Sequence, residues 1–367
     1  MFDRRLVQYF DWGLLCVTLI ISAIGLMTLY SAVSAGISTP QKVLYARQLI
    51  WYGLGLTAMI ISFLFHYKAL ERWASVFYLF CILLLIAVLL FGRYIGGSRR
   101  WLTIASISIQ PSELVKIATI IVLARYYSNL GKTTGLKLKE LLIPSVLVVI
   151  PFILIVKQPD LGTAVLVLLI AASITCFVKI EKRTLIYIIA FCGITIPSVW
   201  FFLKEYQKQR ILTFLNPERD PLGTGYHIIQ SKIAIGSGML YGKGFLQGTQ
   251  NAFSFLPEEH TDFIFSVLAE EWGFTGSILL LFAFLMLIVC GLNIAYGCRD
   301  SFGTILAVGI TAMLAWEIFI NIGMVAGIVP VVGVPLPFIS YGGSSILTVM
   351  ISIGILMNIS MRRFMHQ

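Results

Sequence analysis

The sequence is poor in charged residues and rich in apolar ones. Asp, Glu, Lys and Arg make up 12% of the 367 residues, whereas hydrophobic residues make up 58%. About a quarter of the residues of an ordinary soluble domain are charged. A chain with half that fraction cannot cover the surface of a water-soluble globule of this size. The composition therefore excludes a soluble globular domain and indicates a polytopic membrane protein.

Cysteine, histidine and common catalytic motifs are also scarce. The six cysteines lie within or beside apolar runs without CxxC spacing, so they are expected to be packing residues. Four dispersed histidines argue against a His-rich metal site, and the sequence lacks HExxH, GxSxG and Walker motifs. The basic residues stand mostly in short loops between apolar runs, a distribution typical of membrane topology and not of nucleic-acid binding.

Long apolar runs are what the sequence does contain. A membrane-spanning helix needs about 20 apolar residues, and runs of this kind cover 12–33, 48–65, 73–92, 161–178, 184–203 and 272–295. Segment 111–127 is apolar apart from three charges, segment 141–156 contains two prolines, and prolines and glycines near 330–337 divide 301–361 into two spans. The prediction is an all-α polytopic membrane protein with ten transmembrane helices in one domain, 1–367. Segment 12–33 is too long for a signal-peptide core and is taken as a retained helix.

The distribution of Lys and Arg predicts the orientation of these helices. With both termini in the cytoplasm, inner segments carry fourteen Lys and Arg residues and the short outer loops carry six. This asymmetry follows the positive-inside preference. The longest connection, 204–261, then lies outside the cell membrane as a large extracytoplasmic loop between the seventh and eighth helices. Its glycines and aromatic residues predict a segment that lies on the membrane surface and covers a cavity.

Ionisable residues within apolar segments are candidates for function, because a charge is costly in a bilayer. Glu113 and Lys116 are three residues apart and share one helix face. They are either a structural ion pair or part of a cationic pocket, together with Arg100 just upstream, that binds an anionic headgroup. Asp160 stands at the outer start of a span. It either caps that helix or belongs to the same pocket.

A second group of polar residues closes the long connection. His260 and Asp262 immediately precede an apolar run, where a carboxylate can cap the helix or stabilise its positive end. Four further carboxylates crowd this point, which is more than capping requires: Glu258, Glu259, Glu270 and Glu271. These residues alone leave open a transporter, an enzyme acting on a lipid-linked substrate, or a scaffold.

Several segments resemble the signature motifs of the SEDS family, the shape, elongation, division and sporulation proteins. The matching segments are Arg100-Trp101, QPSELVK at 110–116, QPDLGT at 158–163, DPLGTGYH at 220–227, FLPEEHTDFIF at 255–265 and PLPFISYGGS at 335–344. Segments 236–250 and 268–271 and the short N-terminus resemble the cell-elongation members more than the division or sporulation members.

This resemblance implies a peptidoglycan glycosyltransferase that polymerises lipid II during cell-wall elongation and maintains rod shape. Asp262 stands at the position of the family's essential aspartate and is expected to act as general base, and Glu113 and Lys116 match a functionally sensitive pair. The implied partners are lipid II, the growing glycan strand, a class B penicillin-binding protein transpeptidase and other membrane proteins of the elongation complex. The implied location is the cell inner or cytoplasmic membrane, with the active site facing the periplasm or exterior.

The chemistry of such a transfer agrees with these residues. It needs a base for the acceptor hydroxyl, positive charge for the departing undecaprenyl pyrophosphate, and exclusion of water. The available cations are Lys116, Arg100, Arg99 and Arg210. Asp160 and His260 complete the predicted substrate site. A divalent cation such as Mg²⁺ or Mn²⁺, bridging a carboxylate and the diphosphate, is an open alternative.

Two other functions remain as alternatives. A lipid II flippase would spread its charges through the depth of the bilayer, whereas here all except Glu317 cluster toward the outer face. A non-catalytic scaffold for a transpeptidase would not need buried carboxylates.

Overall fold

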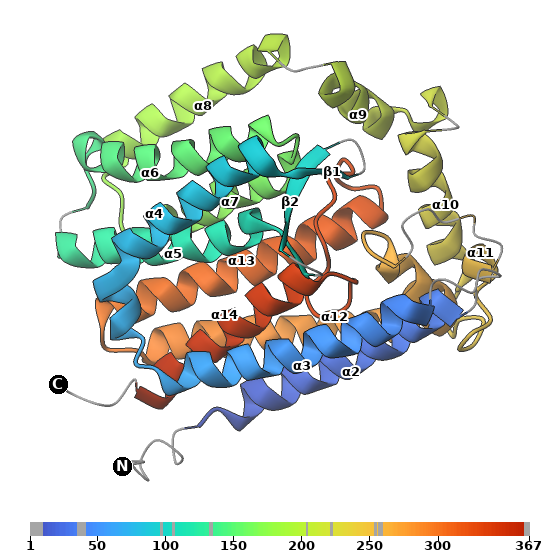
Figure 1. The fold of residues 1–367 in the computed structure, drawn as a ribbon. Helices are drawn as coiled ribbons and strands as arrows, with labels where there is room; N and C mark the ends of the chain where they lie inside the picture. Colours follow the sequence, from blue (N-terminus) through green and yellow to red (C-terminus); the bar gives the residue numbers. More distant parts are fainter. Residues whose placement is uncertain are drawn as a thin grey trace.

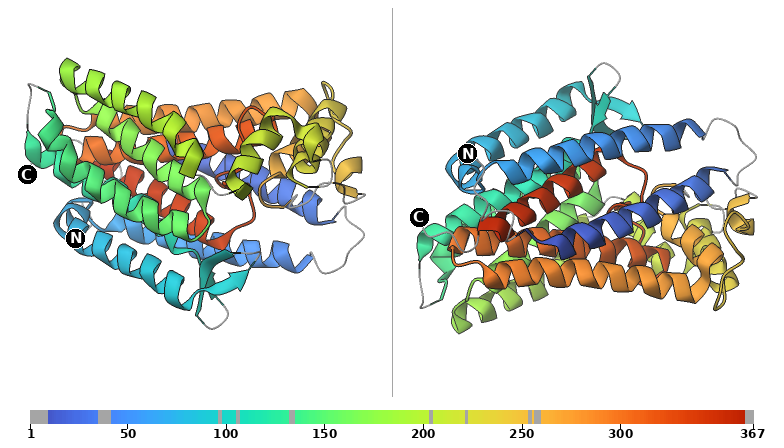
Figure 2. Two further views of the ribbon diagram at one scale, coloured as in Figure 1. Left: turned by 90° about the horizontal axis from the view of Figure 1, so that it is seen from above. Right: turned by 90° about the horizontal axis from the view of Figure 1, so that it is seen from below.

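The computed structural model describes residues 10–34, 42–95, 98–104, 107–131, 135–202, 205–220, 223–252, 255 and 260–362. A helix forms over every segment that the sequence predicts to be apolar and helical, and the long helices run side by side in one bundle (Figure 1; Figure 2). Their bounds are α2 Trp12–Ser34, α3 Lys42–Leu64, α4 Lys68–Phe91, α5 Pro111–Leu130, α6 Leu138–Lys157, α7 Leu161–Phe177, α8 Lys182–Phe202, α12 Ile264–Gly297, α13 Ser301–Val325 and α14 Gly343–Arg362.

These helices make the chain a multi-pass membrane protein. Seven of the described helices are long and apolar enough to cross a membrane, namely α2, α3, α4, α6, α12, α13 and α14, and α7 is apolar but shorter. Helices α5 and α8 have similar lengths, of 20 and 21 residues. The predicted count of ten spans therefore stays a prediction.

The start of α2 and the end of α14 lie at the same end of the bundle. The Phe10 ring lies 6.3 Å from the Phe63 ring near the end of α3. The guanidinium of Arg362 donates a 3.0 Å hydrogen bond to the Leu64 carbonyl of the same helix. The opposite end carries the short strands and helices α9, α10 and α11 (Figure 1).

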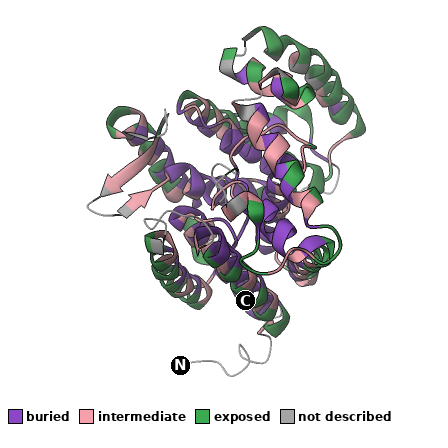
Figure 3. Ribbon diagram, turned by 90° about the vertical axis from the view of Figure 1, so that its right-hand side faces the viewer, coloured by how far each residue is buried: buried purple, intermediate pink, exposed green. Residues whose placement is uncertain are grey.

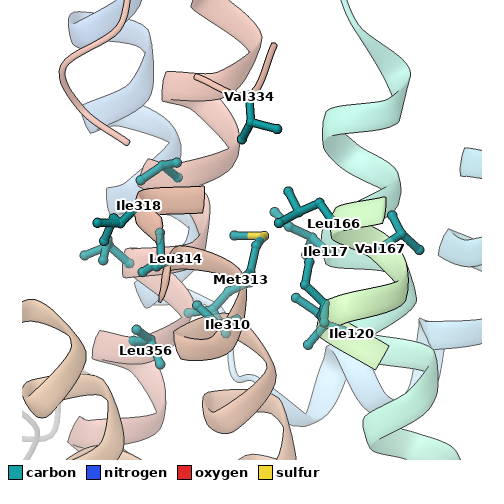
Figure 4. Packing of buried hydrophobic residues seen from close by; sticks show 14 of the residues in the cluster. Ile117, Ile120, Leu166, Val167, Ile310, Met313, Leu314, Ile318, Val334 and Leu356 are labelled. Carbon is teal, nitrogen blue, oxygen red and sulfur yellow. The ribbon is translucent and has the colours of Figure 1, made fainter. Parts of the chain in front are cut away.

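The bundle is apolar outside as well as inside. Large side chains such as Ile50 and Phe91 are 64% and 79% exposed on its flanks, as expected for surfaces that contact lipid, whereas the central helices are mostly buried (Figure 3). Figure 4 shows Met313 of α13 pointing toward Ile117 of α5 and Leu166 of α7. Small residues allow such contacts, and a Cβ at Gly309 of α13 would lie 2.5 Å from Ile120.

A small antiparallel sheet joins α4 to α5, which the all-α prediction missed. Strands β1 Arg93–Ile95, β2 Ser98–Ile104 and β3 Ile107–Ile109 pair in the order β1-β2-β3, with Thr103 opposite Ser108. Only β3 shows the strict alternation of apolar and polar residues expected of a strand, because Arg99 and Arg100 are adjacent in β2, as are Trp101 and Leu102. The sheet places Arg100 and Trp101 at the end of the bundle opposite to Arg362.

The long connection, 204–261, is partly helical. It contains α9 Glu205–Leu215, a 3₁₀ turn at Pro217–Arg219, α10 Thr224–Ser237 and α11 Thr249–Ala252. Helix α10 packs on the bundle, because the Ser231 hydroxyl lies 2.9 Å from the Ser266 hydroxyl and donates to the Val325 carbonyl at 2.6 Å. That this connection covers a cavity on the membrane surface stays a prediction.

Helix α12 begins eight residues earlier than the apolar run predicted and is kinked at Gly273, which has φ +66°. Residues 239–244 pair with the backbone around the kink, since Lys243 donates its amide to the Glu270 carbonyl and Phe274 donates to the Met239 carbonyl. The Glu270 carboxylate accepts from Lys243 Nζ at 2.6 Å and the Thr249 amide at 2.9 Å. The Glu271 carboxylate accepts from the hydroxyl of Ser31 on α2.

Candidate active site

Asp262 lies in a turn at the start of α12, half-buried beside the connection between α13 and α14. Its backbone carbonyl accepts a 3.0 Å hydrogen bond from the Asn321 side chain. A Cβ at Gly333, where φ is +73°, would lie 3.2 Å from Asp262 Oδ2, so the carboxylate lies against the backbone of that connection. The N-cap residue of α12 is Phe263 and not Asp262.

A cavity of about 750 Å³ lies beside this turn. His260 and Thr261 form part of its lining, whereas the next residue, Asp262, does not. One wall belongs to α3, where Ile50 and Leu54 also face the lipid side of the bundle. The remaining lining residues are Arg47, Trp51, Trp101, Ser108, Tyr341, Gly342 and Gly343. The cavity thus combines polar, aromatic and cationic groups with a surface that an apolar chain could follow.

Asp160 and Arg100 are brought together at the same end of the bundle. Asp160 is the N-cap of α7, which confirms the capping interpretation, and accepts from the amide and hydroxyl of Thr163. It also accepts from Gln110 Nε2 at 3.0 Å. Arg100 forms an ion pair with this carboxylate at 3.8 Å and donates a hydrogen bond to the Pro159 carbonyl. Both residues therefore stabilise the start of α7.

Helices α5, α7, α12 and α14 begin at this end of the bundle, as does α3. The first turns of α5 and α14 are in contact, because the Gln110 amide donates to the Ser344 hydroxyl at 3.0 Å. A Cβ at Gly162 would lie 2.4 Å from the Val332 carbonyl, next to Gly333 and Asp262. Helix N-termini carry partial positive charge. The end of the bundle that holds Asp262 is therefore suited to an anionic group such as a diphosphate.

Glu113 and Lys116 are paired as predicted, and a third charge joins them. Lys116 Nζ lies 2.8 Å from Glu113 Oε2 and 2.6 Å from Glu317 Oε1 on α13. The Lys116 side chain is 1% exposed, and both carboxylates are buried. The cluster carries two negative charges for one positive charge when all three groups are ionised. This geometry favours the structural ion pair, and the anion-binding role of Lys116 stays a prediction.

The other predicted site residues are placed separately. The His260 ring lines the cavity and lies 6.0 Å from the Tyr341 ring. Arg210 lies on α9. Glu258 and Glu259 lie outside the described residues. Within the part of the chain that is described, no group of three or more His, Cys, Asp or Glu side chains could hold a metal ion, so the predicted divalent cation stays a prediction.

Sequence reasoning did not single out Asn321 or Trp51, and it named Trp101 only within a family motif. Asn321 is four residues after Glu317 on α13 and is fully buried. A polar amide within an apolar span is a signal of the same kind as a charge there, so it could have been found. Trp51 and Trp101 gave no such signal, because aromatic residues are common near the ends of membrane helices.

The fold and these polar groups define an integral membrane protein with a candidate active site at one end of a helical bundle. A family model described as "Cell cycle protein", which covers FtsW, RodA and SpoVE, matches residues 11–364. The chain therefore belongs to the FtsW/RodA/SpoVE family, which confirms the resemblance found in the sequence.

Individual relatives agree with this assignment. The peptidoglycan glycosyltransferase MrdB of Escherichia coli K12 is 43% identical over 341 residues, which are 92% of each chain. Stage V sporulation protein E of Bacillus subtilis 168 is 38% identical over 95% of this chain and 96% of its own. The peptidoglycan glycosyltransferase RodA of Treponema pallidum is 33% identical over 98% of this chain and 99% of its own.

Solved structures show the same fold. A chain from a peptidoglycan synthase complex, studied for its coordination of polymerization and crosslinking, has a TM-score of 0.83 at 30% identity and covers 97% of this chain and 99% of its own. The rod shape determining protein RodA of Thermus thermophilus has a TM-score of 0.72 at 27% identity and covers 97% of this chain and 98% of its own.

Proposed function

We propose that this chain is a peptidoglycan glycosyltransferase that polymerises lipid II into glycan strands during cell-wall elongation. The observation that carries this proposal is the position of Asp262, half-buried beside a cavity of about 750 Å³ with one lipid-facing wall. A lipid-linked disaccharide needs such a place, because its sugar must reach a polar site while its tail stays in the membrane. Relatives named peptidoglycan glycosyltransferase over nearly the full length support it.

In the proposed reaction Asp262 takes the proton from the acceptor sugar hydroxyl. The hydroxyl oxygen then attacks the anomeric carbon of the donor sugar. A glycosidic bond forms as the bond to the pyrophosphate oxygen breaks, and undecaprenyl pyrophosphate leaves with the electron pair. A pyrophosphate is a good leaving group without protonation, so one carboxylate suffices. A general base of this kind contributes about 10²–10⁴-fold to the rate.

The leaving diphosphate needs positive charge, and several groups can supply it in this proposal. The first turns of α5, α7, α12 and α14 present their positive ends at this end of the bundle. Arg100, His260 and Arg210 remain proposed substrate ligands, and Arg47 joins them because it lines the cavity. A divalent cation bridging a carboxylate and the diphosphate remains an alternative source of charge.

Asp160, Glu113 and Lys116 were predicted to bind substrate, and we propose that they act mainly by positioning. Asp160 fixes the start of α7, next to the connection that touches Asp262. Lys116 joins α5 to Glu317 of α13, and α13 carries Asn321 one turn further on. A direct contact of Lys116 with the diphosphate would require the cluster to open.

We further propose that ten helices span the membrane, with both termini in the cytoplasm and Asp262 facing the periplasm or exterior. The start of α2 and the end of α14 lie at the same end of the bundle, which supports an even number of crossings. The proposed partners are lipid II, the glycan strand, a class B penicillin-binding protein transpeptidase and other elongation-complex membrane proteins. The resemblance to a chain from a peptidoglycan synthase complex supports the transpeptidase.

The decisive experiment incubates the purified full-length protein with labelled lipid II and follows strand length by gel electrophoresis. Polymer formation is expected. Movement of lipid II between the leaflets of a vesicle without polymer would favour the flippase. If neither polymer nor transfer between leaflets is seen, with or without a purified transpeptidase, the scaffold is favoured.

A further inference from the structure

Three consecutive backbone carbonyls at the proposed base are each held by a separate donor. The His260 carbonyl accepts from the Tyr341 amide at 2.9 Å. The Thr261 carbonyl accepts from the Ser340 hydroxyl at 2.6 Å, and the Asp262 carbonyl accepts from Asn321 Nδ2 at 3.0 Å. Helix α12 begins at the next residue but one, so its intrahelical bonds do not fix this turn. The turn that carries Asp262 is fixed from outside.

Asn321 joins this turn to a second segment of the chain. Its amide nitrogen also donates to the Val334 carbonyl at 2.8 Å, so it joins the Asp262 turn to the connection between α13 and α14. Its Oδ1 has no hydrogen-bond partner among the described residues. The reverse orientation of the amide would place this oxygen against two carbonyl oxygens, so the two acceptors determine which way the side chain points.

The same amide holds both the backbone of Asp262 and the segment that its carboxylate touches. Val334 follows Gly333 directly, and the Asp262 carboxylate lies against Gly333. The base is therefore fixed at its own backbone and at the surface on which it lies. Asn321 itself is fully buried on α13, and Glu317 ties that helix to α5 one turn away. Contacts with two of the most buried helices, α13 and α5, thus determine the position of the carboxylate.

From this geometry we infer that Asn321 is a positioning residue, whose side-chain amide sets the distance between the Asp262 carboxylate and the acceptor hydroxyl. The inference rests on the proposed role of Asp262 as general base. A displacement of a reacting group by about 1 Å can lower a rate about 100-fold. Loss of the amide should therefore lower kcat and leave substrate binding nearly unchanged.

Asn358 supplies a matched control at the opposite end of the bundle. It is also a fully buried asparagine, on α14, and its amide donates to the Phe63 carbonyl at 2.6 Å and to the Phe65 carbonyl. It accepts from the Tyr67 amide at 3.1 Å. The substitution Asn358→Leu therefore removes at least as many hydrogen bonds as Asn321→Leu, but far from Asp262.

The test measures kcat and KM for lipid II polymerisation, and the Tm, of the full-length protein carrying Asn321→Leu, Asn358→Leu or Asp262→Asn. We expect Asn321→Leu to lower kcat about 100-fold with KM unchanged, whereas Asn358→Leu lowers the Tm and leaves kcat unchanged. Ser340→Ala, a smaller change that releases the Thr261 carbonyl, should lower kcat by a smaller factor. If Asn321→Leu does not fold, the kcat of Ser340→Ala tests the positioning role instead.

Two outcomes overturn the inference. One is wild-type kcat in folded Asn321→Leu or, failing that protein, in Ser340→Ala. The other is an equal fall of kcat in Asn358→Leu, because it would show that any lost buried amide has this effect. Full activity of Asp262→Asn would instead refute the proposed role of Asp262 as general base. Because this variant is measured in the same assay, failure of that role can be distinguished from failure of the role of Asn321.

Discussion

The carboxylates at one end of this bundle have different surroundings, and those surroundings separate structural residues from the proposed base. Asp160 and Glu270 are 1% and 0% exposed and accept several hydrogen bonds each from neighbouring side chains and amides. Glu271 accepts from Ser31. Asp262 is only half-buried, and the residue before it lines the cavity. A group that exchanges a proton with substrate needs such access.

Replacement of this side chain should therefore stop the reaction without disturbing the fold. Asp262→Asn keeps the shape and cannot take a proton, so we expect lipid II polymerisation to fall by at least about 100-fold with unchanged membrane insertion and Tm. The control is Asp300→Asn, because Asp300 caps α13 at the other end of the bundle and asparagine caps equally well. Strand synthesis by Asp262→Asn at the rate of the control protein would refute the assignment.

A pair of charges on one helix could be predicted from its spacing, whereas a partner on a distant helix could not. Glu113 and Lys116 could be paired from their spacing alone. Their third partner, Glu317, was visible as an isolated charge, but no local pattern could show that it faces Lys116. The polar contacts of Asn321 were hidden for the same reason.

At the scale of the elements, the charged cluster joins α5 to α13. Removing one member of a buried ion pair leaves an unpaired charge and costs about 3–5 kcal/mol. Lys116→Met leaves two carboxylates together and should prevent stable folding. Glu317→Gln leaves the neutral pair of Glu113 and Lys116 and should lower the free energy of unfolding much less. Thermal unfolding of the two purified variants measures the difference, and equal stabilities would contradict the assigned geometry.

The same cluster allows a separate test of whether Lys116 binds the diphosphate. Replacing only Glu113 and Lys116 would leave Glu317 as an unpaired carboxylate, so the neutral test variant needs all three changes, Glu113→Gln, Lys116→Met and Glu317→Gln. We expect this triple variant to recover both stability and polymerisation relative to Lys116→Met. Recovery of the Tm without activity would instead identify Lys116 as a substrate ligand.

The kink of α12 is the element that apolar periodicity could not reveal. Gly273 has φ +66°, and an added Cβ would lie 2.3 Å from the Gly242 amide nitrogen. We expect Gly273→Ala to separate residues 239–244 from α12, to lower the Tm by several degrees, and to speed tryptic cleavage after Lys243. Gly236→Ala is the matched control, because it lies in helix α10 with open space around it. Slow cleavage in both variants would contradict this role.

Helix positions were the most predictable feature, since hydropathy alone locates a segment that must satisfy its backbone within the bilayer. The sheet between α4 and α5 was not predicted, because three short strands of three to seven residues give little periodic signal. Helices α9 and α10 were hidden in a polar, glycine-rich stretch. The connection therefore appeared as a loop, although its packing against α12 and α13 orders it.

At the scale of the whole molecule, the two ends of the bundle should face opposite sides of the membrane. A cysteine placed at each end can report which side of the membrane that end faces. Ser254, in the long connection, lies outside the described residues, but two exposed tyrosines mark the two ends. Tyr241 is 82% exposed in the connection before α12, and Tyr296 is 95% exposed at the end of α12. In a protein without native cysteines, a membrane-impermeant thiol reagent applied to intact cells should label Tyr241→Cys and not Tyr296→Cys. The reverse pattern would invert the topology and place Asp262 on the side of the cytoplasm.

The contact between Lys116 and Glu317 also has a consequence for the order in which the protein is made. The two residues are 201 positions apart, so at about 5–20 residues per second α5 is synthesised roughly 10–40 s before α13. During this interval Lys116 enters the bilayer with Glu113 alone, as a locally neutral pair that the insertion machinery can accept. The second carboxylate then docks onto a helix already in place. A chain whose translation stops before α13 would leave Lys116 paired with Glu113 and without Glu317.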